Sequence, residues 1–306
     1  MDKSALGMTT ADTLAAPARL AFGATLRAAF GIVFGRLGLF LRAAAMPFLL
    51  SLVLTGFEVM VPVIANAVDV VSDSEVTAGV LLIVIGALSL FPFAIFGVVL
   101  TRLCLDGPAA GILPRPFPGK RVWRFFGYSL LMTFCFILAI ALMVVPVAIL
   151  AEGEFGAPVI DGVWIVLAFV VFLMLVLYLL LRLSLVFPAI AMDDSLRLRG
   201  SWRLTRKGSL KLSAACGVLL LMQLLAIFIG STLFGQPGEG TTVSVVVPGD
   251  EESELLAVFM AGAPNALWNS VVGLLFFAMF TGALASAYAQ LTGWGAPRQE
   301  ILDRFE

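Results

Sequence analysis

The sequence contains no histidine among its 306 residues, and charged residues make up only 13% of it. The absence of histidine excludes a Ser-His-Asp triad, a histidine-ligated haem and nearly all zinc sites. An ordinary soluble domain has about 25% charged residues, so the charge content here is close to half of that share. The low charge, together with 61% hydrophobic residues, excludes a soluble enzyme, a disordered tail and a disulfide scaffold.

Cysteine is also scarce, with Cys104, Cys135 and Cys216 far apart and each inside an apolar run. None of them forms a CxxC pair, the spacing that is typical of a redox couple or a metal clip. We expect all three to be small, buried apolar residues. The sequence therefore predicts no disulfide framework, no metal site, no cofactor and no catalytic residue.

Hydrophobic residues are abundant instead, at 61% of the chain with a mean hydropathy of +1.06. Six apolar stretches approach or exceed the roughly 20 residues that cross a bilayer as a helix. They lie at about 43–67, 78–105, 124–150, 162–191, 210–235 and 265–291. Because they lack the alternation of barrel strands, the sequence predicts an all-α, polytopic bundle of six transmembrane helices.

The remaining segments complete a single membrane domain. Residues 1–19 carry no basic start followed by an apolar core, so we expect a polar tail there instead of a signal peptide. An apolar stripe with small residues opposite predicts a basic interfacial helix over 20–42. The membrane domain then covers 20–292, and 293–306 forms a second polar tail. Pro92 and Pro188 predict a tilt or kink in the second and fourth spans.

The basic residues fall in alternate connecting segments. All 19 lysines and arginines lie before the first span, in or beside the connections between the second and third and between the fourth and fifth spans, or after the sixth. The other connections carry acids, for example Asp73, Glu154 and Glu239. Basic loops stay in the cytoplasm, so we expect a bacterial inner-membrane protein with both termini in the cytoplasm.

The layout also suggests an internal repeat. A shift of 170 residues aligns six identical pairs: Leu26 with Leu196, Arg27 with Arg197, Arg36 with Arg206, Gly38 with Gly208, Ala44 with Ala214 and Ala45 with Ala215. Such units would be parallel repeats about an axis along the membrane normal. The alternative is that basic segments before spans simply follow the positive-inside rule.

The most distinctive stretch runs from Arg182 through Pro188 to Asp194 and on to a Ser-Trp-Arg-Leu-Thr segment that starts at Ser201. It resembles the membrane domain of some bacterial glycerophosphoryl diester phosphodiesterases and stand-alone YciC-like proteins. The resemblance implies a helical inner-membrane domain of unestablished function. The family's phosphodiesterase activity belongs to a separate barrel with histidines and metal-binding acids, which this chain lacks, so that activity is not expected here.

The basic segment after the fourth span is the first candidate site. Helical spacing puts Leu198, Trp202 and Thr205 on one stripe, with the basic residues on the other side. The candidate contacts to lipid headgroups are Arg199, Arg203, Arg206 and Lys207. Each charge near an anionic surface contributes about 1 kcal/mol, and the alternative is that these residues only set topology. Nucleic-acid binding is not expected, because no aromatic platform accompanies the charges.

Two further candidates lie within the spans. Glu58 falls in the outer half of the first span and four residues before Pro62, so it must be protonated, paired or hydrated. Arg182 lies near the inner boundary of the fourth span. We expect it to snorkel or to pair with one of three acids, which are Asp106, Asp193 and Asp194.

These features favour a non-enzymatic membrane protein that organises lipids, a membrane-protein partner or its own copies. The alternative is a small-solute or proton-coupled transporter that uses Glu58, although Gln223 and Tyr178 are the only other polar candidates within the spans. An intramembrane enzyme would need a nucleophile or acid set, which the sequence does not supply.

Overall fold

The computed structural model describes residues 20–35, 37–67, 74–107, 119–151, 162–194, 198–206, 208–234 and 251–294. At 58–67, 74–78, 145–151, 162–166 and 251–262 the description covers the backbone only. All regular secondary structure in these ranges is helical.

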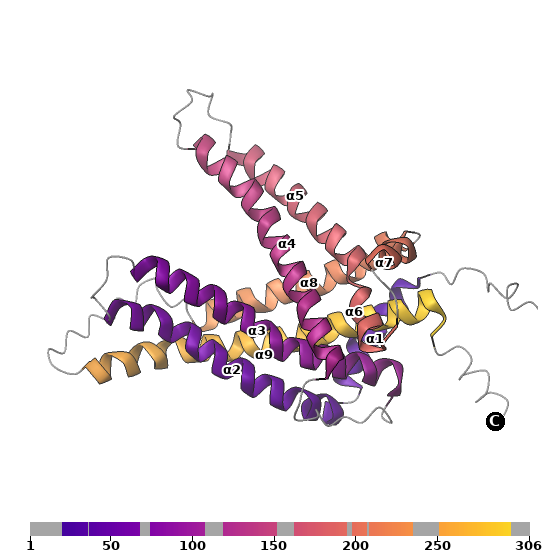
Figure 1. Cartoon of the computed structure of the whole chain (residues 1–306), viewed down its shortest axis with the longest axis horizontal. Coiled ribbons are helices and arrows are strands. Elements are labelled where there is room, and N and C mark those ends of the chain that lie inside the picture. Colours follow the sequence, from indigo (N-terminus) through magenta and orange to yellow (C-terminus); the bar gives the residue numbers. More distant parts are fainter. Residues whose placement is uncertain are drawn as a thin grey trace, which may run out of the picture.

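The helices follow one another along the chain as in Figure 1. They are α1 (Phe22–Phe34), α2 (Leu37–Ala67), α3 (Ser74–Leu105), α4 (Lys120–Ala151), α5 (Gly162–Leu183), α6 (Val186–Ala191), α7 (Leu198–Thr205), α8 (Ser209–Phe234) and α9 (Glu251–Thr292). Six helical segments, one each in α2, α3, α4, α8 and α9 and one formed by α5 with α6, are long and apolar enough to cross a membrane. The predicted all-α, six-span architecture is therefore confirmed.

Successive long helices run in opposite directions, so the bundle has two distinct ends. We call the end where α2, α4 and α8 begin and α3, α5 and α9 finish the basic end. The short helices α1, α6 and α7 also lie there (Figure 1). The described lysines and arginines lie at or near this end, within the first two turns or the last turn of the long helices and on or beside the short ones.

Helix α9 is the centre of the bundle. Over an 18-residue apolar stretch of its span 61% of the residues are buried inside the molecule, whereas none are over the corresponding stretch of α4. Helices α1, α2, α3 and α8 all pack against α9 (Figure 1). Small residues such as Ala278 and Ala283 let these neighbours approach closely, as in other membrane bundles.

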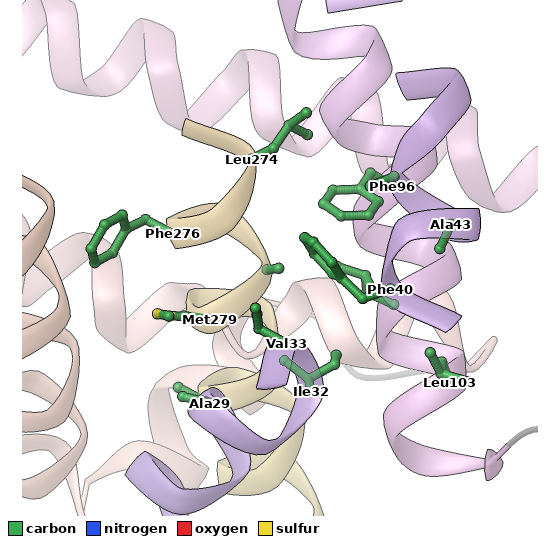
Figure 2. Close-up of a cluster of buried hydrophobic side chains, with 14 of the residues drawn as sticks. Ala29, Ile32, Val33, Phe40, Ala43, Phe96, Leu103, Leu274, Phe276 and Met279 are labelled. Atoms are coloured by element: carbon green, nitrogen blue, oxygen red, sulfur yellow. The ribbon is translucent and has the colours of Figure 1, made fainter. Parts of the chain in front are cut away.

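Figure 2 shows part of the largest buried cluster, to which α1, α2, α3, α8 and α9 contribute. Ile32 and Val33 of α1, Phe40 of α2, Phe96 of α3 and Met279 of α9 are each less than a tenth exposed. The rings of Phe40 and Phe96 lie 5.9 Å apart at a tilt, a favourable arrangement for aromatic pairs. This cluster fixes α1, α2 and α3 around the central helix.

Two helix boundaries differ from the sequence-based expectation. The segment 20–42, predicted as one interfacial helix, is divided after Gly35 between α1 and the start of α2. The fourth span is interrupted at Ser184 and Leu185. Pro188 explains this interruption, because its ring displaces the Ser184 carbonyl and provides no amide hydrogen for it. The amide of Phe187 donates to that carbonyl instead, at 3.0 Å.

The cysteines only partly follow the expectation. Cys216 is buried, as predicted, but Cys104 and Cys135 are exposed on the surfaces of α3 and α4. On an apolar helix in a membrane this surface faces lipid, which accepts a thiol as readily as a protein core does.

Helices α8 and α9 make their closest approach where Trp268 crosses Gly230. The indole Nε1 donates to the Ala226 carbonyl at 2.9 Å, which satisfies the only polar group of this side chain. A Cβ atom added at Gly230 would lie 2.1 Å from the indole ring. Gly230 is therefore required for this contact.

Gly230→Ala should lower the thermal midpoint in detergent, because the ring must move, and overpacking of this kind costs about 1–3 kcal/mol. Gly217→Ala is the matched control on the same helix, because a Cβ atom there meets nothing within 4 Å. Fluorescence-detected thermal melts would measure both. Equal midpoints for the two variants would contradict the close approach.

Candidate functional site

Helix α7 is amphipathic, and its two faces have different roles. Ser201 and Thr205 are buried, whereas Arg199, Arg203 and Arg206 are exposed. At about 100° per residue the three arginines fall within roughly 60° of one another, opposite the buried pair. The helix is therefore docked by its hydroxyl face and presents guanidinium groups on the other face.

Arg182, in the last turn of α5, attaches α7 to the bundle. Its guanidinium carbon lies 3.7 Å from the centre of the Trp202 ring, within cation–π range. Its Nη2 donates to the Trp202 carbonyl at 3.1 Å. In return, the Ser201 hydroxyl donates to the Arg182 carbonyl at 2.8 Å. We call this set of contacts the Arg182 clamp.

The clamp satisfies groups that a helix end leaves unpaired. The Arg182 carbonyl belongs to the last turn of α5, where the following helical donors are absent. Ser201 supplies a donor for it, and Arg182 caps the end of α7 by binding the Trp202 carbonyl. A stacked guanidinium that also donates hydrogen bonds contributes on the order of 2 kcal/mol.

A second polar contact joins α5 to the start of α8. The hydroxyl groups of Tyr178 and Ser209 lie 3.0 Å apart, and the Tyr178 ring lies 5.9 Å from the Arg182 guanidinium. Tyr178, a candidate for a transport pathway, therefore already has a structural partner at the basic end.

The two acids after α6 connect three helices. The backbone at Asp193 is left-handed with φ of 57°, and the Asp194 amide donates back to the Ala189 carbonyl at 2.8 Å. This is the Schellman arrangement that ends many helices, here with aspartate where glycine is usual. Arg121 of α4 binds the Asp193 carboxylate through Nε and Nη2, and Tyr288 of α9 donates to Asp194.

These contacts correct one of the two alternatives expected for Arg182, the pairing with an acid, and do not test the other, snorkelling. Arg182 does not pair with an acid in the described part of the chain, because each of the three candidates has another partner. Arg121 binds Asp193, Tyr288 binds Asp194, and Arg102 lies 4.0 Å from Asp106 one turn along α3. Arg182 instead uses backbone carbonyl and aromatic acceptors on α7.

The other predicted site residues are placed less completely. Arg199, Arg203 and Arg206 share one exposed face, as expected, but Lys207 lies outside the described residues. Glu58 lies within α2, and its side chain is outside the described residues too.

Sequence reasoning missed Arg121 and Tyr288 as partners of the acid pair. In the sequence Arg121 is one of 19 basic residues that follow the same pattern, and Tyr288 lies inside the sixth predicted span. One signal was available: Tyr288 is one of three tyrosines, and a hydroxyl group inside an apolar helix needs a partner. Its partner is 94 residues away along the chain, so local pattern could not identify it.

The chemistry of this site is that of binding. Among the described residues, no group of three His, Cys, Asp or Glu side chains is arranged to hold a metal ion. What the basic end offers is an array of fixed guanidinium groups, which donate hydrogen bonds to phosphate and carboxylate oxygens. The chain matches no protein-family model, no curated protein and no solved structure.

Arg182→Lys should loosen α7, since lysine keeps the charge but loses the planar stack and the guanidinium hydrogen bond. We expect amide hydrogen exchange over 198–205 to become about tenfold faster, as a loss of 1.4 kcal/mol implies. Arg203→Lys is the control, because it makes the same change on the exposed face of α7. If both variants exchange at the parent rate, the clamp does not hold the helix.

Proposed function

We propose that this protein is a non-enzymatic integral membrane protein of the bacterial inner membrane, which binds anionic lipid headgroups through α7. In this proposal the basic end faces the cytoplasm, where positively charged loops are retained. The family resemblance of the segment 182–208 agrees with this, since it implies a helical membrane domain without a catalytic barrel.

The observation that carries the proposal is the exposed arginine face of a helix that is fixed to the bundle. Arg199, Arg203 and Arg206 point away from the docked side of α7, and within the described part of the chain no ion pair or hydrogen bond occupies their guanidinium groups. Because the Arg182 clamp holds the backbone of α7, these groups form a preorganised array. Preorganisation lowers the entropic cost of binding a multivalent anionic surface.

Trp202 supports the same interpretation. It is 39% exposed beside the arginines, and tryptophan favours the headgroup level of a membrane. An aromatic ring next to basic groups on a short interfacial helix is typical of segments that lie against anionic lipids. Recruitment of such lipids would then organise the membrane around the bundle, or around a protein partner or further copies of this chain.

The second candidate, a proton-coupled transporter based on Glu58, rests on the sequence alone. It needs polar groups that converge within the membrane. Of the other two candidates, Tyr178 bonds with Ser209 at the basic end, and Gln223 is half-buried in α8. The lipid-binding function is therefore the one that the described geometry supports better.

Replacement of Arg199, Arg203, Arg206 and Lys207 by glutamine should lower the amount of acidic lipid that co-purifies in mild detergent. Each charge near an anionic surface contributes about 1 kcal/mol, so we expect a loss of roughly tenfold or more in affinity for anionic vesicles. Raised salt should reduce lipid binding by the parent protein in the same way, because it screens such charges. Mass spectrometry of bound lipid and vesicle flotation measure both effects.

The control replaces an equal number and type of exposed basic residues elsewhere at the basic end: Arg27, Arg42, Lys120 and Arg124. If α7 is the binding element, this variant should keep most of its acidic lipid. Equal losses in both variants would show that only total charge matters, and unchanged lipid in the α7 variant would leave α7 with a topological role alone.

A further inference from the structure

Helices α4 and α5 form an antiparallel hairpin that departs from the rest of the bundle. Figure 1 shows this hairpin leaving the basic end at a wide angle to α2, α3, α8 and α9, which run roughly along one direction. The described side chains of α4 beyond the first two turns are all at least partly exposed. The hairpin therefore meets its neighbours at its base and diverges from them beyond it.

Apolar packing at the base is tight. The Phe125 ring of α4 occupies the place where a side chain at Gly97 of α3 would be, since a Cβ atom there would lie 2.6 Å from its Cζ atom. The same ring lies 4.7 Å from that of Phe187 in α6. Phe91 of α3 adds a contact with Trp123, 5.4 Å between ring centres.

The polar contacts that attach the hairpin also lie at the base. Arg121 in the first turn of α4 binds Asp193, Tyr178 of α5 contacts Ser209, and the Arg182 clamp joins α5 to α7. Packing and polar contacts thus coincide within the same few turns.

The outer part of α4 and the outer part of α3 both have apolar surfaces. On α4, Phe134 is 61% and Leu142 is 68% exposed. On α3, Ile83 is 73% exposed. From Phe125 to Ala151 the sequence of α4 contains no charged residue. Water is a poor solvent for apolar surfaces. In a membrane, lipid acyl chains therefore fill the space between the outer parts of α4 and α3.

The angle of the hairpin is weakly determined away from the base. Acyl chains are as apolar as leucine, so two helices gain little free energy from contact with each other instead of lipid. The base therefore sets the angle almost alone. The helix is also interrupted at the base of the hairpin, at Ser184 and Leu185 between α5 and α6.

We propose that the α4–α5 hairpin swings as one unit about its base, so that acyl chains enter and leave the space between it and α3. Two discrete arrangements of a packed base, separated by a small free energy, are sufficient for such a motion. The ion pair between Arg121 and Asp193 favours one of them, because it joins the hairpin to the segment that follows α6. This motion does not depend on lipid binding by α7.

The test is a spin-label distance measurement in lipid nanodiscs on the full chain with its three cysteines replaced by alanine. One label pair, at Leu142 of α4 and Ile83 of α3, reports the angle. Both sites lie about 33 Å from the basic ends of their helices. The matched bundle pair is Ile83 with Leu233 of α8, and the pair Leu142 with Val171 reports the hairpin itself.

The proposal predicts a Leu142–Ile83 distance distribution with more than one maximum, or roughly twice as wide as those of the two control pairs. Asp193→Gly should change the ratio of the populations by up to about fivefold, the effect expected for a partly exposed ion pair. Glycine suits the left-handed backbone at this position, so the variant removes the pair without straining the turn.

Three results would overturn the proposal. The first is a single narrow Leu142–Ile83 distribution like that of the bundle pair. The second is an equally broad Leu142–Val171 distribution, because that would indicate two independent helices instead of one hairpin. The third is a Leu142–Ile83 distribution that Asp193→Gly leaves unchanged.

Discussion

A charged or hydrogen-bonding side chain is costly in hydrocarbon unless it has a partner, and the arrangement of this bundle follows from that constraint. Most of the described polar contacts between helices lie at the basic end. Asp194 accepts a hydrogen bond from Tyr288 on the central helix, Asp193 pairs with Arg121, and Arg182 binds the backbone of α7. The first two join segments that are far apart in the sequence, and water and headgroups can solvate the groups that remain unpaired in this region.

Away from the basic end the helices are held together mainly by close packing, not by polar contacts. Ala278 of α9 lets neighbouring helices approach closely, and Gly230 admits the Trp268 ring. Because lipid removes the hydrophobic driving force between helices, such fit is what distinguishes a packed interface from a lipid-facing surface. Helices α1, α2, α3 and α8 have this fit with α9, whereas α4 and α5 have large apolar side chains exposed along most of their described length.

The short helix α7 connects these two parts of the molecule. It is docked on α5 through Arg182 and leads directly into α8, so its orientation depends on the base of the hairpin. Its exposed arginines are consequently held at a defined position relative to the bundle. A flexible basic loop would carry the same charge but would lose more conformational entropy on binding.

Much of the fold was predictable, because span length and charge distribution are local properties of a sequence. Apolar runs gave the six spans, and Pro188 correctly predicted a disturbance in the fourth. The helical spacing of Leu198, Trp202 and Thr205 also predicted that the arginines of α7 share the opposite face. What the sequence could not give were contacts between distant segments, such as Tyr288 with Asp194. It also could not predict that α4 and α5 diverge, since their hydropathy is like that of the packed spans.

The internal repeat and the orientation stay predictions. A short helix precedes α2 as α7 precedes α8, which agrees with the alignment of the two segments without testing it. Of the two, orientation has the greater consequence for function, because headgroup binding by α7 depends on the side of the membrane that the basic end faces.

The six-span arrangement and its orientation are therefore tested most directly by a cysteine-labelling experiment on intact cells with a reagent that does not cross the membrane. Single cysteines at Asp73, Glu154 and Glu239 should react from outside, whereas those at Arg115, Arg206 and Arg298 should react only after the membrane is opened. Labelling of both sets from outside would contradict the six-span arrangement with its basic end in the cytoplasm.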